Sequence, residues 1–297
     1  VRSGESQTWK CEFRIRARDG ATHWVFESAV ELRDESGISH GSIGLFQDIT
    51  ERKQTERLQE SIYEIARAAM ITQSLNELYT KIHEVLQGLL PTQYFYIALY
   101  DQEQDLLSFP YFQDAFDEAL PLGKPGHGLT EYVLRTQQPL LATQKVTNEL
   151  MRQGHIELIG PDSIEWLGVP LIAQGQTVGV MVVQSYEESV HFSQQDVEVM
   201  TYVSTQVASA IERKRVEEAL KESEKRFHSL FNNATVGMYR TTPNGRILLS
   251  NPAAIRMLGY DSFEELANQN LEKGDIEPIS QRRQFLEQME REGTIVG

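Results

Sequence analysis

The sequence predicts an α+β fold. A central domain has an antiparallel sheet with helices on its faces, and long helical linkers join it to two flanking partial domains. Three observations lead to this prediction. Residues 193–231 contain no Gly or Pro, which favours one long helix. Other segments alternate polar and apolar residues around tight-turn signals, which favours antiparallel strands, and they occur both before and after further helical patterns. A length of 297 residues with 40% hydrophobic side chains suffices for about two domains.

The first fifty residues predict a three-stranded antiparallel meander. Residues 9–17, 23–30 and 43–46 have strand patterns, separated by Asp-Gly and Ser-Gly turn signals. The alternation places Cys11 on an inward face, where a small buried hydrophobe is expected. One face of the second strand carries Trp24, Phe26, Ser28 and Val30. A meander alone has no second layer to bury its apolar face, so residues 1–50 are predicted to be the back half of a domain.

A short polar motif, Asp-Ile-Thr-Glu-Arg-Lys, follows the meander at residues 48–53. Asp48 and Thr50 are short polar side chains that can tie the last strand to the start of an outgoing helix. Together with the Asp-Gly turn and the Trp-containing strand, this motif resembles the C-terminal part of a PAS domain with its exit motif. The resemblance implies a PAS half at residues 1–50 and a helical linker at residues 51–57.

Two amphipathic helices are predicted after this linker. The first has apolar residues at spacings of four and three from Leu58 to Ala69, a seam suited to a partner helix. The second runs from Leu75 to Leu89 and is closed by Pro91.

Residues 193–231 predict one long helix. Ser193 and Asp196 form a start signal of the capping-box kind. At roughly 1.5 Å per residue the helix would reach about 58 Å, longer than a small domain is wide, so we expect it to transmit a signal to the next domain. A parallel homodimer is expected to form through its apolar stripe and that of the first helix. The expected dimer and signalling residues are Leu58, Ile62, Ile65, Val203, Val207 and Leu220.

The middle of the chain resembles a GAF domain over residues 58–212. The order helix, helix, strand, strand, loop with short helices, strand, strand, long helix carries this resemblance, and residues 144–163 stay ambiguous between helix and loop. The strands are expected at residues 94–100, 106–112, 166–171 and 177–185. The supporting residues are Gly126 and Gly128 before Leu129, Pro139-Leu140, Gly168–Leu171, Val178–Val180, and Phe192 with Asp196.

The GAF resemblance implies a ligand pocket under the loop at residues 123–128. Its expected lining residues are His127, Glu131, Trp166 and Tyr111, with Arg135 supplying a charge. The alternative role for His127 is that of a surface residue in the loop, and for Trp166 that of a core residue. Metal binding has no support beyond scattered single histidines.

A second Glu-Arg-Lys joint opens the last segment at residues 212–214. A helix with Phe227 and Phe231, a hairpin around a Pro-Asn-Gly turn, and a helix start at Asn251-Pro252 follow. As a set they resemble the N-terminal half of a second PAS domain. The resemblance implies a helical linker at residues 213–226 and a truncated PAS half at residues 227–297.

The net charge of −15 is concentrated in residues 58–212, which hold 6 basic and 20 acidic side chains and therefore carry −14 of it. Such a domain repels nucleic acid and anionic membranes, so neither is expected as a partner. A solvated acidic surface is the expected role of this charge, and a site for a cation or basic ligand is the alternative.

The single cysteine excludes an internal disulfide, and no stretch approaches the roughly 20 apolar residues of a membrane span. A cytoplasmic protein is therefore expected. Because the chain opens at Val1 without an initiator Met, we expect it to be a piece of a longer polypeptide.

No nucleotide-binding loop, metalloprotease motif, nucleophile elbow or cysteine cluster is present in the sequence. The chain itself is expected to be non-enzymatic. No cofactor is identified, although an unknown small-molecule ligand is compatible with the pocket. A covalent bilin would need a cysteine in the GAF segment, a flavin adduct one after Asn251, and a haem an axial histidine within residues 270–297. All three are absent. Gln184-Ser185 replaces the Asn-Lys of cyclic-nucleotide-binding relatives, which argues against that ligand.

These resemblances imply a sensory and regulatory segment of a bacterial signal-transduction protein. The parent is expected to be a sensor histidine kinase of a two-component phosphorelay, with a kinase output domain in the same chain and a response regulator as its partner. A ligand-free dimerisation scaffold, or the sensory segment of a diguanylate cyclase or phosphodiesterase, is the alternative.

Overall fold

The computed structural model describes residues 8–269 except 19, 35 and 243, together with residues 284 and 287–291. The chain divides into two compact units, Val1–Arg215 and Val216–Gly297. None of the helices in this described part combines the length and the apolar character that a bilayer crossing requires.

The first unit begins with the predicted meander, a three-stranded antiparallel sheet in the order β1-β2-β3. Its strands are β1 (Thr8–Arg16), β2 (Thr22–Arg33) and β3 (Ser39–Asp48). The register pairs Phe13 with Val25 and Arg14 with Trp24. The two apolar faces expected from the sequence therefore lie on opposite sides of this sheet, because neighbouring positions along a strand point to opposite faces.

The prediction that Cys11 is buried is wrong. Its side chain is exposed, as is every residue of β1 except the half-buried Phe13. The buried residues of β2 are Val25 and Ala29 and not those of the Trp24 face. The reason is that β1 is an edge strand with β2 as its one strand neighbour, and the strand's exposure shows that no described layer covers it.

Helices α1 (Thr50–Ile71) and α2 (Leu75–Gln87) follow the meander. Ser74 caps α2, because its hydroxyl oxygen accepts a hydrogen bond from the backbone N–H of Glu77 at 3.3 Å. The Glu77 carboxylate accepts one in return from the backbone N–H of Gln73 at 2.8 Å. This reciprocal pair satisfies one open donor of the first turn, that of Glu77, and the donor of Gln73 just before the cap.

The central sheet has five strands in the order β5-β4-β8-β7-β6, and all neighbouring strands are antiparallel. Its strands are β4 (Tyr94–Asp101), β5 (Leu106–Gln113), β6 (Leu140–Thr143), β7 (Glu165–Ala173) and β8 (Gln176–Ser185). Gln174 and Gly175 join β7 to β8 with positive φ angles of 51° and 78°. This is the conformation that a two-residue hairpin turn requires, at the predicted place.

Helix α3 (Leu129–Thr136) is the short helix that the sequence predicts after the glycine-rich loop. The ambiguous segment at residues 144–163 begins as α4 (Gln144–Arg152) and continues as loop. Thr143 caps α4 by accepting from the backbone N–H of Val146. The remaining long helix, α5 (Gln194–Asn233), starts after Ser193, whose reciprocal hydrogen bonds with Asp196 form the predicted capping box.

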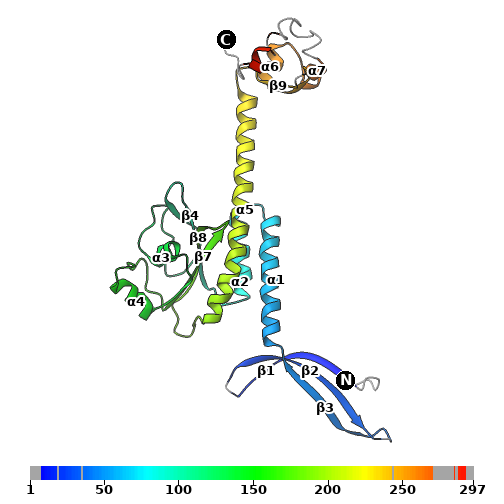
Figure 1. Cartoon of the computed structure of the whole chain (residues 1–297), viewed down its shortest axis with the longest axis vertical. Helices are drawn as coiled ribbons and strands as arrows, with labels where there is room; N and C mark the ends of the chain where they lie inside the picture. The colour runs from blue at the N-terminus through cyan, green and yellow to red at the C-terminus, as the bar shows by residue number, and fades with distance from the viewer. Residues whose placement is uncertain are drawn as a thin grey trace. The chain divides into compact units, whose positions relative to one another are not determined.

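The two faces of the central sheet are covered differently. On one face, α1, α2 and the first part of α5 enclose a continuous apolar core in which Leu78, Phe95, Met181 and Met200 are fully buried. Figure 1 shows these three helices side by side. On the opposite face a smaller cluster forms around Tyr96 and Trp166, under α3, α4 and loops.

The core position of α1 and α5 corrects the predicted dimer seam. Ile65, Val203 and Val207 have no exposed surface, and Leu58 and Ile62 are half-buried. Ile65, Val203 and Val207 belong to the core of their own chain, so these three side chains cannot meet a partner helix while the domain is folded. Leu220 differs, because 61% of its surface is exposed.

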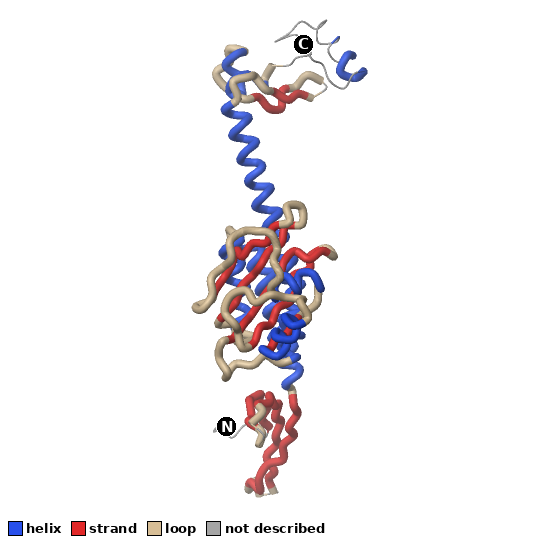
Figure 2. Tube along the Cα trace, turned by 90° about the vertical axis from the view of Figure 1, so that its left-hand side faces the viewer, coloured by secondary structure: helices blue, strands red, loops and turns tan. Residues whose placement is uncertain are grey.

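The second unit contains the C-terminal part of α5 and a small hairpin with two short helices. Its elements are β9 (Tyr239–Thr241), β10 (Ile247–Ser250), α6 (Pro252–Met257) and α7 (Phe263–Ala267), and Figure 2 colours them by type. Asn251 has no exposed surface and joins these elements. Its side chain accepts from Met238 N and Ala254 N and donates to the carbonyls of Phe231 and Val236, at 2.9–3.0 Å. The rest of the segment predicted at 227–297 lies largely outside the described residues.

Candidate functional site

A cavity of about 80 Å³ lies on the second face of the central sheet. Residues of β4, β5, β7 and β8 form one side of it. The first turn of α3, α4 and the loops around residues 117–120 and 156–163 form the other. The cavity therefore lies where the sheet is not sealed by the large helical core.

Two aromatic side chains form the floor of the cavity. The indole N–H of Trp166 donates to the hydroxyl of Tyr96 at 3.1 Å, and this hydroxyl also bonds the Thr130 hydroxyl at 2.8 Å. The indole lies across Gly168, where a Cβ atom would come within 2.1 Å of the ring. Burial raises the pKa of Tyr96, so the cavity floor carries a neutral phenol near pH 7.

Phe109 and Phe112 form an aromatic wall beside Tyr96. The rings of Tyr96 and Phe112 are stacked with centroids 5.0 Å apart. A register shift between β4 and β5 falls at Phe109 and Pro110. This bulge lets both phenylalanines, three residues apart, line the same cavity.

The same bulge explains why Tyr111 does not belong to the cavity. Its side chain lies on the helical face of the sheet, where its hydroxyl is 2.9 Å from Nδ1 of His83 on α2. A regular strand would have placed Tyr111 beside Phe109. The prediction of Tyr111 as a pocket residue is wrong for this reason.

Glu131 is the buried acid of the cavity. It lies in the first turn of α3 with 4% of its surface exposed, and its Oε1 accepts a hydrogen bond from Gly126 N at 3.1 Å. A Cβ atom on Gly128 would come within 2.9 Å of Oε2, so a larger residue there would displace the carboxylate. The predicted loop thus holds Glu131 against the cavity.

Four further carboxylates line the cavity, and none of its described lining residues is Lys, Arg or His. Asp117 is half-buried, and burial together with the charges of Asp114 and Glu118 raises its pKa above the ordinary 3.8. Glu118, Glu157 and Asp162 lie exposed at the rim. The acidic excess of the domain is thus partly gathered at this site.

The remaining predicted residues lie near the cavity and do not line it. His127 is exposed in the loop, which is the alternative role that the sequence allows. Arg135 donates to the carbonyls of Gly126 at 3.5 Å and His155 at 3.0 Å, so it ties two loops together instead of supplying a charge. Glu131 and Trp166 are the predicted residues that do line the cavity.

The start of β7 connects the cavity face with the start of α5. Trp166 faces the cavity, and the neighbouring Glu165 points to the opposite side, where it is 8% exposed. Its carboxylate accepts from the backbone N–H of Phe192 at 2.6 Å and lies 2.9 Å from Nδ1 of His191. One pair of neighbouring residues therefore contacts both the site and the segment that begins α5.

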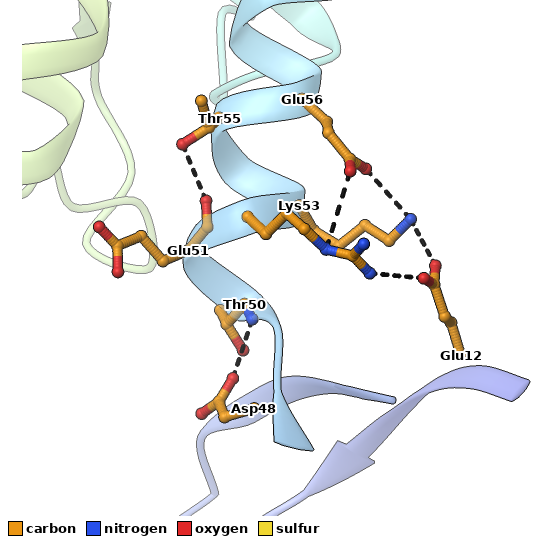
Figure 3. A network of polar contacts seen from close by, with 8 residues as sticks. Glu12, Asp48, Thr50, Glu51, Lys53, Thr55 and Glu56 are labelled. Carbon is orange, nitrogen blue, oxygen red and sulfur yellow. Dashed lines mark hydrogen bonds and ion pairs between the residues drawn. The ribbon is translucent and has the colours of Figure 1, made fainter. Parts of the chain in front are cut away.

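The predicted exit motif forms a second polar site, at the junction of β3 and α1 (Figure 3). Asp48 accepts a hydrogen bond from the backbone N–H of Thr50 at 2.8 Å and lies 3.0 Å from Nδ1 of His23. The Thr50 hydroxyl accepts from the backbone N–H of Trp24 at 2.9 Å. Asp48 and Thr50 thus fix the start of α1 to β2, as the sequence predicts.

Charged residues of α1 extend this junction to β1. Glu12 accepts from Arg52 at 2.5 Å and from Lys53 at 2.6 Å, and Lys53 also pairs with Glu56 at 3.2 Å (Figure 3). Lys53 in addition lies 5.7 Å from the ring centre of Trp24. The first turn of α1 is therefore held to two strands of the meander.

No group of three or more histidine, cysteine or acidic side chains in the described part of the chain is arranged to hold a metal ion. The donor atoms around the cavity belong to carboxylates that are spread over α3 and two loops.

Comparison with protein families agrees with this architecture. The GAF domain family matches residues 72–212, a PAS domain family matches residues 1–51, and the PAS fold family matches residues 225–295. The chain contains a GAF domain between PAS segments. The cavity, α3 and the five-stranded sheet all belong to the GAF domain.

Individual relatives are more distant. A curated relative is the methyl sulfide methyltransferase-associated sensor of Methanosarcina acetivorans, 27% identical over 280 residues. The match covers 88% of this chain and 27% of the relative, so the chain spans about a quarter of that protein.

Among solved structures, the GAF domain of a phosphoenolpyruvate-protein phosphotransferase from Coxiella burnetii is 19% identical with a TM-score of 0.44. That match covers 55% of this chain and 98% of the other. The GAF domain of a two-component sensor histidine kinase from Bacillus halodurans is 15% identical with a TM-score of 0.39, covering 50% and 99%.

Proposed function

We propose that this chain is the sensory segment of a multidomain signal-transduction protein, in which the GAF domain binds a small ligand and its terminal helices relay the bound state. The observation that carries this proposal is the position of β7. Its residue Trp166 lines the cavity, and its residue Glu165 holds the segment that leads into α5. A ligand that shifts Trp166 would shift this anchor with it.

A second contact joins the two terminal helices of the GAF domain. Lys214 of α5 is 2% exposed, and its ammonium group donates to the carbonyl of Thr72, the residue that ends α1, at 2.6 Å. Movement of α5 would therefore also displace the end of α1. The cavity itself favours this role over a scaffold whose pocket is filled by its own side chains.

The output domain lies outside this chain in the proposal, because the chain corresponds to about a quarter of its sensor relative. We propose a histidine kinase output in a two-component phosphorelay, with a response regulator as partner. Residues 51–57 and 213–226 would serve as helical linkers. A diguanylate cyclase or phosphodiesterase output is the alternative.

A parallel dimer remains part of the proposal, with its contact moved to exposed apolar residues. Tyr63 on α1, Tyr202 on α5, and Val216 and Leu220 beyond the GAF core are each more than half exposed, at 56–64%. Such residues can pair across two copies without opening either core. Sedimentation at high concentration that shows a monomer throughout would contradict this contact.

An insertion series in the full-length protein tests helix-borne relay. Four residues inserted after Arg215 rotate the following helix by about 40°, whereas seven residues rotate it by about 20° in the opposite sense and nearly keep a heptad register. We expect the four-residue insertion to change the rate of autophosphorylation from ATP several-fold and the seven-residue insertion to leave it close to that of the parent.

Equal rates in both insertions, with the GAF domain folded, would overturn the relay. Formation of a cyclic dinucleotide from GTP, without phosphorylation, would instead favour the cyclase output. Native mass spectrometry of the 297-residue chain, purified without added ligand, tests binding separately. A reproducible extra mass is expected, and its value identifies the ligand.

A further inference from the structure

We propose that the GAF cavity binds a small organic ammonium cation. This inference rests on the proposed function, since it names the class of ligand that the sensory cavity takes. Five carboxylates line the site without a described basic side chain among the lining residues. The domain around it, residues 58–212, holds 20 acidic and 6 basic residues. An anionic ligand would meet repulsion from both.

The walls of the cavity favour an organic cation over a hydrated metal ion. Tyr96, Phe109, Phe112 and Trp166 present aromatic surface to the site. The faces of aromatic rings attract ammonium groups, most strongly where water is excluded, and this is how quaternary ammonium ligands are recognised. A hydrated metal ion would gain little from such walls, because it keeps polar ligands around itself.

Glu131 provides the buried counter-charge. Oε1 receives a hydrogen bond from Gly126 N, and no donor among the described residues bonds Oε2. Because a buried carboxylate is costly unless it is paired, a cation in the cavity would stabilise it.

The same carboxylate argues against a bound anion. The N-terminus of a helix favours negative charge, and here Glu131 in the first turn of α3 already supplies it. The helix N-terminus that opens onto the cavity is therefore complemented by the protein itself.

Size limits the ligand further. A cavity of about 150 Å³ holds benzene, and the GAF cavity has about 80 Å³. A ligand buried entirely here has only a few non-hydrogen atoms, as the methylated ammonium ions have. A larger ligand would have to extend through the rim near Glu157 and Asp162, where further carboxylates would still favour positive charge.

Isothermal titration calorimetry of the whole 297-residue chain tests this assignment. The probe is tetramethylammonium chloride, with tert-butanol as an uncharged ligand of similar size, acetate as an anion, and NaCl and MgCl2 at matched ionic strength. We expect saturable 1:1 binding of tetramethylammonium that is at least about tenfold tighter than binding of tert-butanol. Equal binding of tert-butanol, or equal competition by Na⁺ or Mg²⁺, would overturn the proposal.

Glu131→Gln removes the buried charge and keeps an oxygen that can accept from Gly126 N. It should weaken tetramethylammonium binding by about tenfold or more. Glu103→Gln, on the exposed turn between β4 and β5, is the matched control and should bind as the parent does. An unchanged affinity in Glu131→Gln, or an equal loss in Glu103→Gln, would contradict the assignment.

A second variant keeps the test valid if Glu131→Gln unfolds. Phe109→Leu changes a half-buried wall residue and should weaken the cation several-fold while leaving tert-butanol unaffected. A failure here can be told apart from a failure of the sensory proposal. An extra mass in native mass spectrometry from a neutral or anionic molecule would keep the sensory role and reject the cation.

Discussion

The two faces of the GAF sheet differ in what their side chains do. One face is sealed by α1, α2 and α5 over a large core of fully buried apolar residues. The other carries a smaller aromatic cluster, a cavity and five carboxylates. Because interiors are close-packed and cavities cost stability, the first face can supply stability that offsets the cost of the cavity on the second.

The contrast also supports the proposed relay from the cavity to the helices. The sheet is one layer thick, and alternate residues of one strand point to opposite faces. Trp166 faces the cavity and Glu165 faces the segment that begins α5. One peptide bond therefore separates the residue at the cavity from the residue at the helix. No long chain of intermediaries is needed between the two faces.

The largest expected effect is a difference in the free energy of unfolding between substitutions on the two faces. Phe95 is fully buried on the helical face and stacks on His83 with ring centres 4.7 Å apart. Phe95→Ala should lower the free energy of unfolding by about 3–5 kcal/mol. Phe109→Ala on the cavity face should cost less, about 1 kcal/mol, since that ring is only half-buried. Urea denaturation followed by near-ultraviolet circular dichroism measures both. Equal losses would mean that the faces contribute alike.

Lys214 tests the link between the helices on the sealed face. Lys214→Ala removes the donor to the carbonyl of Thr72, which is buried at the end of α1. The unpaired carbonyl and the lost packing should cost about 1–3 kcal/mol, and hydrogen exchange in the last turn of α1 should become faster.

Lys221→Ala is the matched control, because Lys221 is exposed on the same helix. It should change neither quantity. If Lys214→Ala left the exchange rates of α1 unchanged, the buried hydrogen bond would not couple the two helices.

Asp117 tests the cavity face with two effects of opposite sign. Burial raises its pKa above 3.8, so the folded domain holds this proton more tightly than the unfolded chain does. The contribution of Asp117 to stability is therefore greatest at acid pH and falls as the pH rises from 3.8 through the raised value. Asp117→Asn keeps an acceptor for the backbone N–H of Glu118 and removes that decline.

The variant should thus melt slightly higher than the parent at pH 7 and bind tetramethylammonium a few-fold more weakly. In the parent, cation affinity should fall as the pH is lowered through the pKa of Asp117. Thermal denaturation and calorimetry at pH 4 to 7 measure these changes. A variant that gained both stability and affinity would remove Asp117 from the proposed cation site.

Much of this fold could be predicted from the sequence, because local signals and periodicity agree. The capping box at Ser193, the turn at Gln174-Gly175 and the exit motif at Asp48 and Thr50 all have the predicted hydrogen bonds or backbone angles. In each case the interaction is short-range. Such contacts depend on residues a few positions apart, so one sequence suffices to propose them.

The cavity was harder to predict, because its lining depends on long-range register. Because of the bulge at Pro110, Phe112 lines the cavity in place of Tyr111. A proline within a strand is the sequence signal that indicates such a bulge. Asp117 lies in an acidic loop whose place over the sheet no periodicity reveals. The exposure of Cys11 had a different cause, since alternation shows which residues share a face and not whether another layer covers it.

The smallest expected effect concerns the junction between β1 and α1. Hydrogen bonds from Lys53 and then Arg52 lower the pKa of Glu12 below its ordinary 4.5. The folded state therefore favours the charged form, and the stability from Glu12 is present above pH 4.5 and lost as the pH falls through the lowered value. Because the group is solvent-exposed and screened, Glu12→Gln should shift thermal unfolding only slightly at low salt and not at 1 M NaCl. Glu60→Gln, farther along α1, should show no such salt dependence. A large loss in Glu12→Gln at high salt would mean that packing, and not charge, holds the meander to its helix.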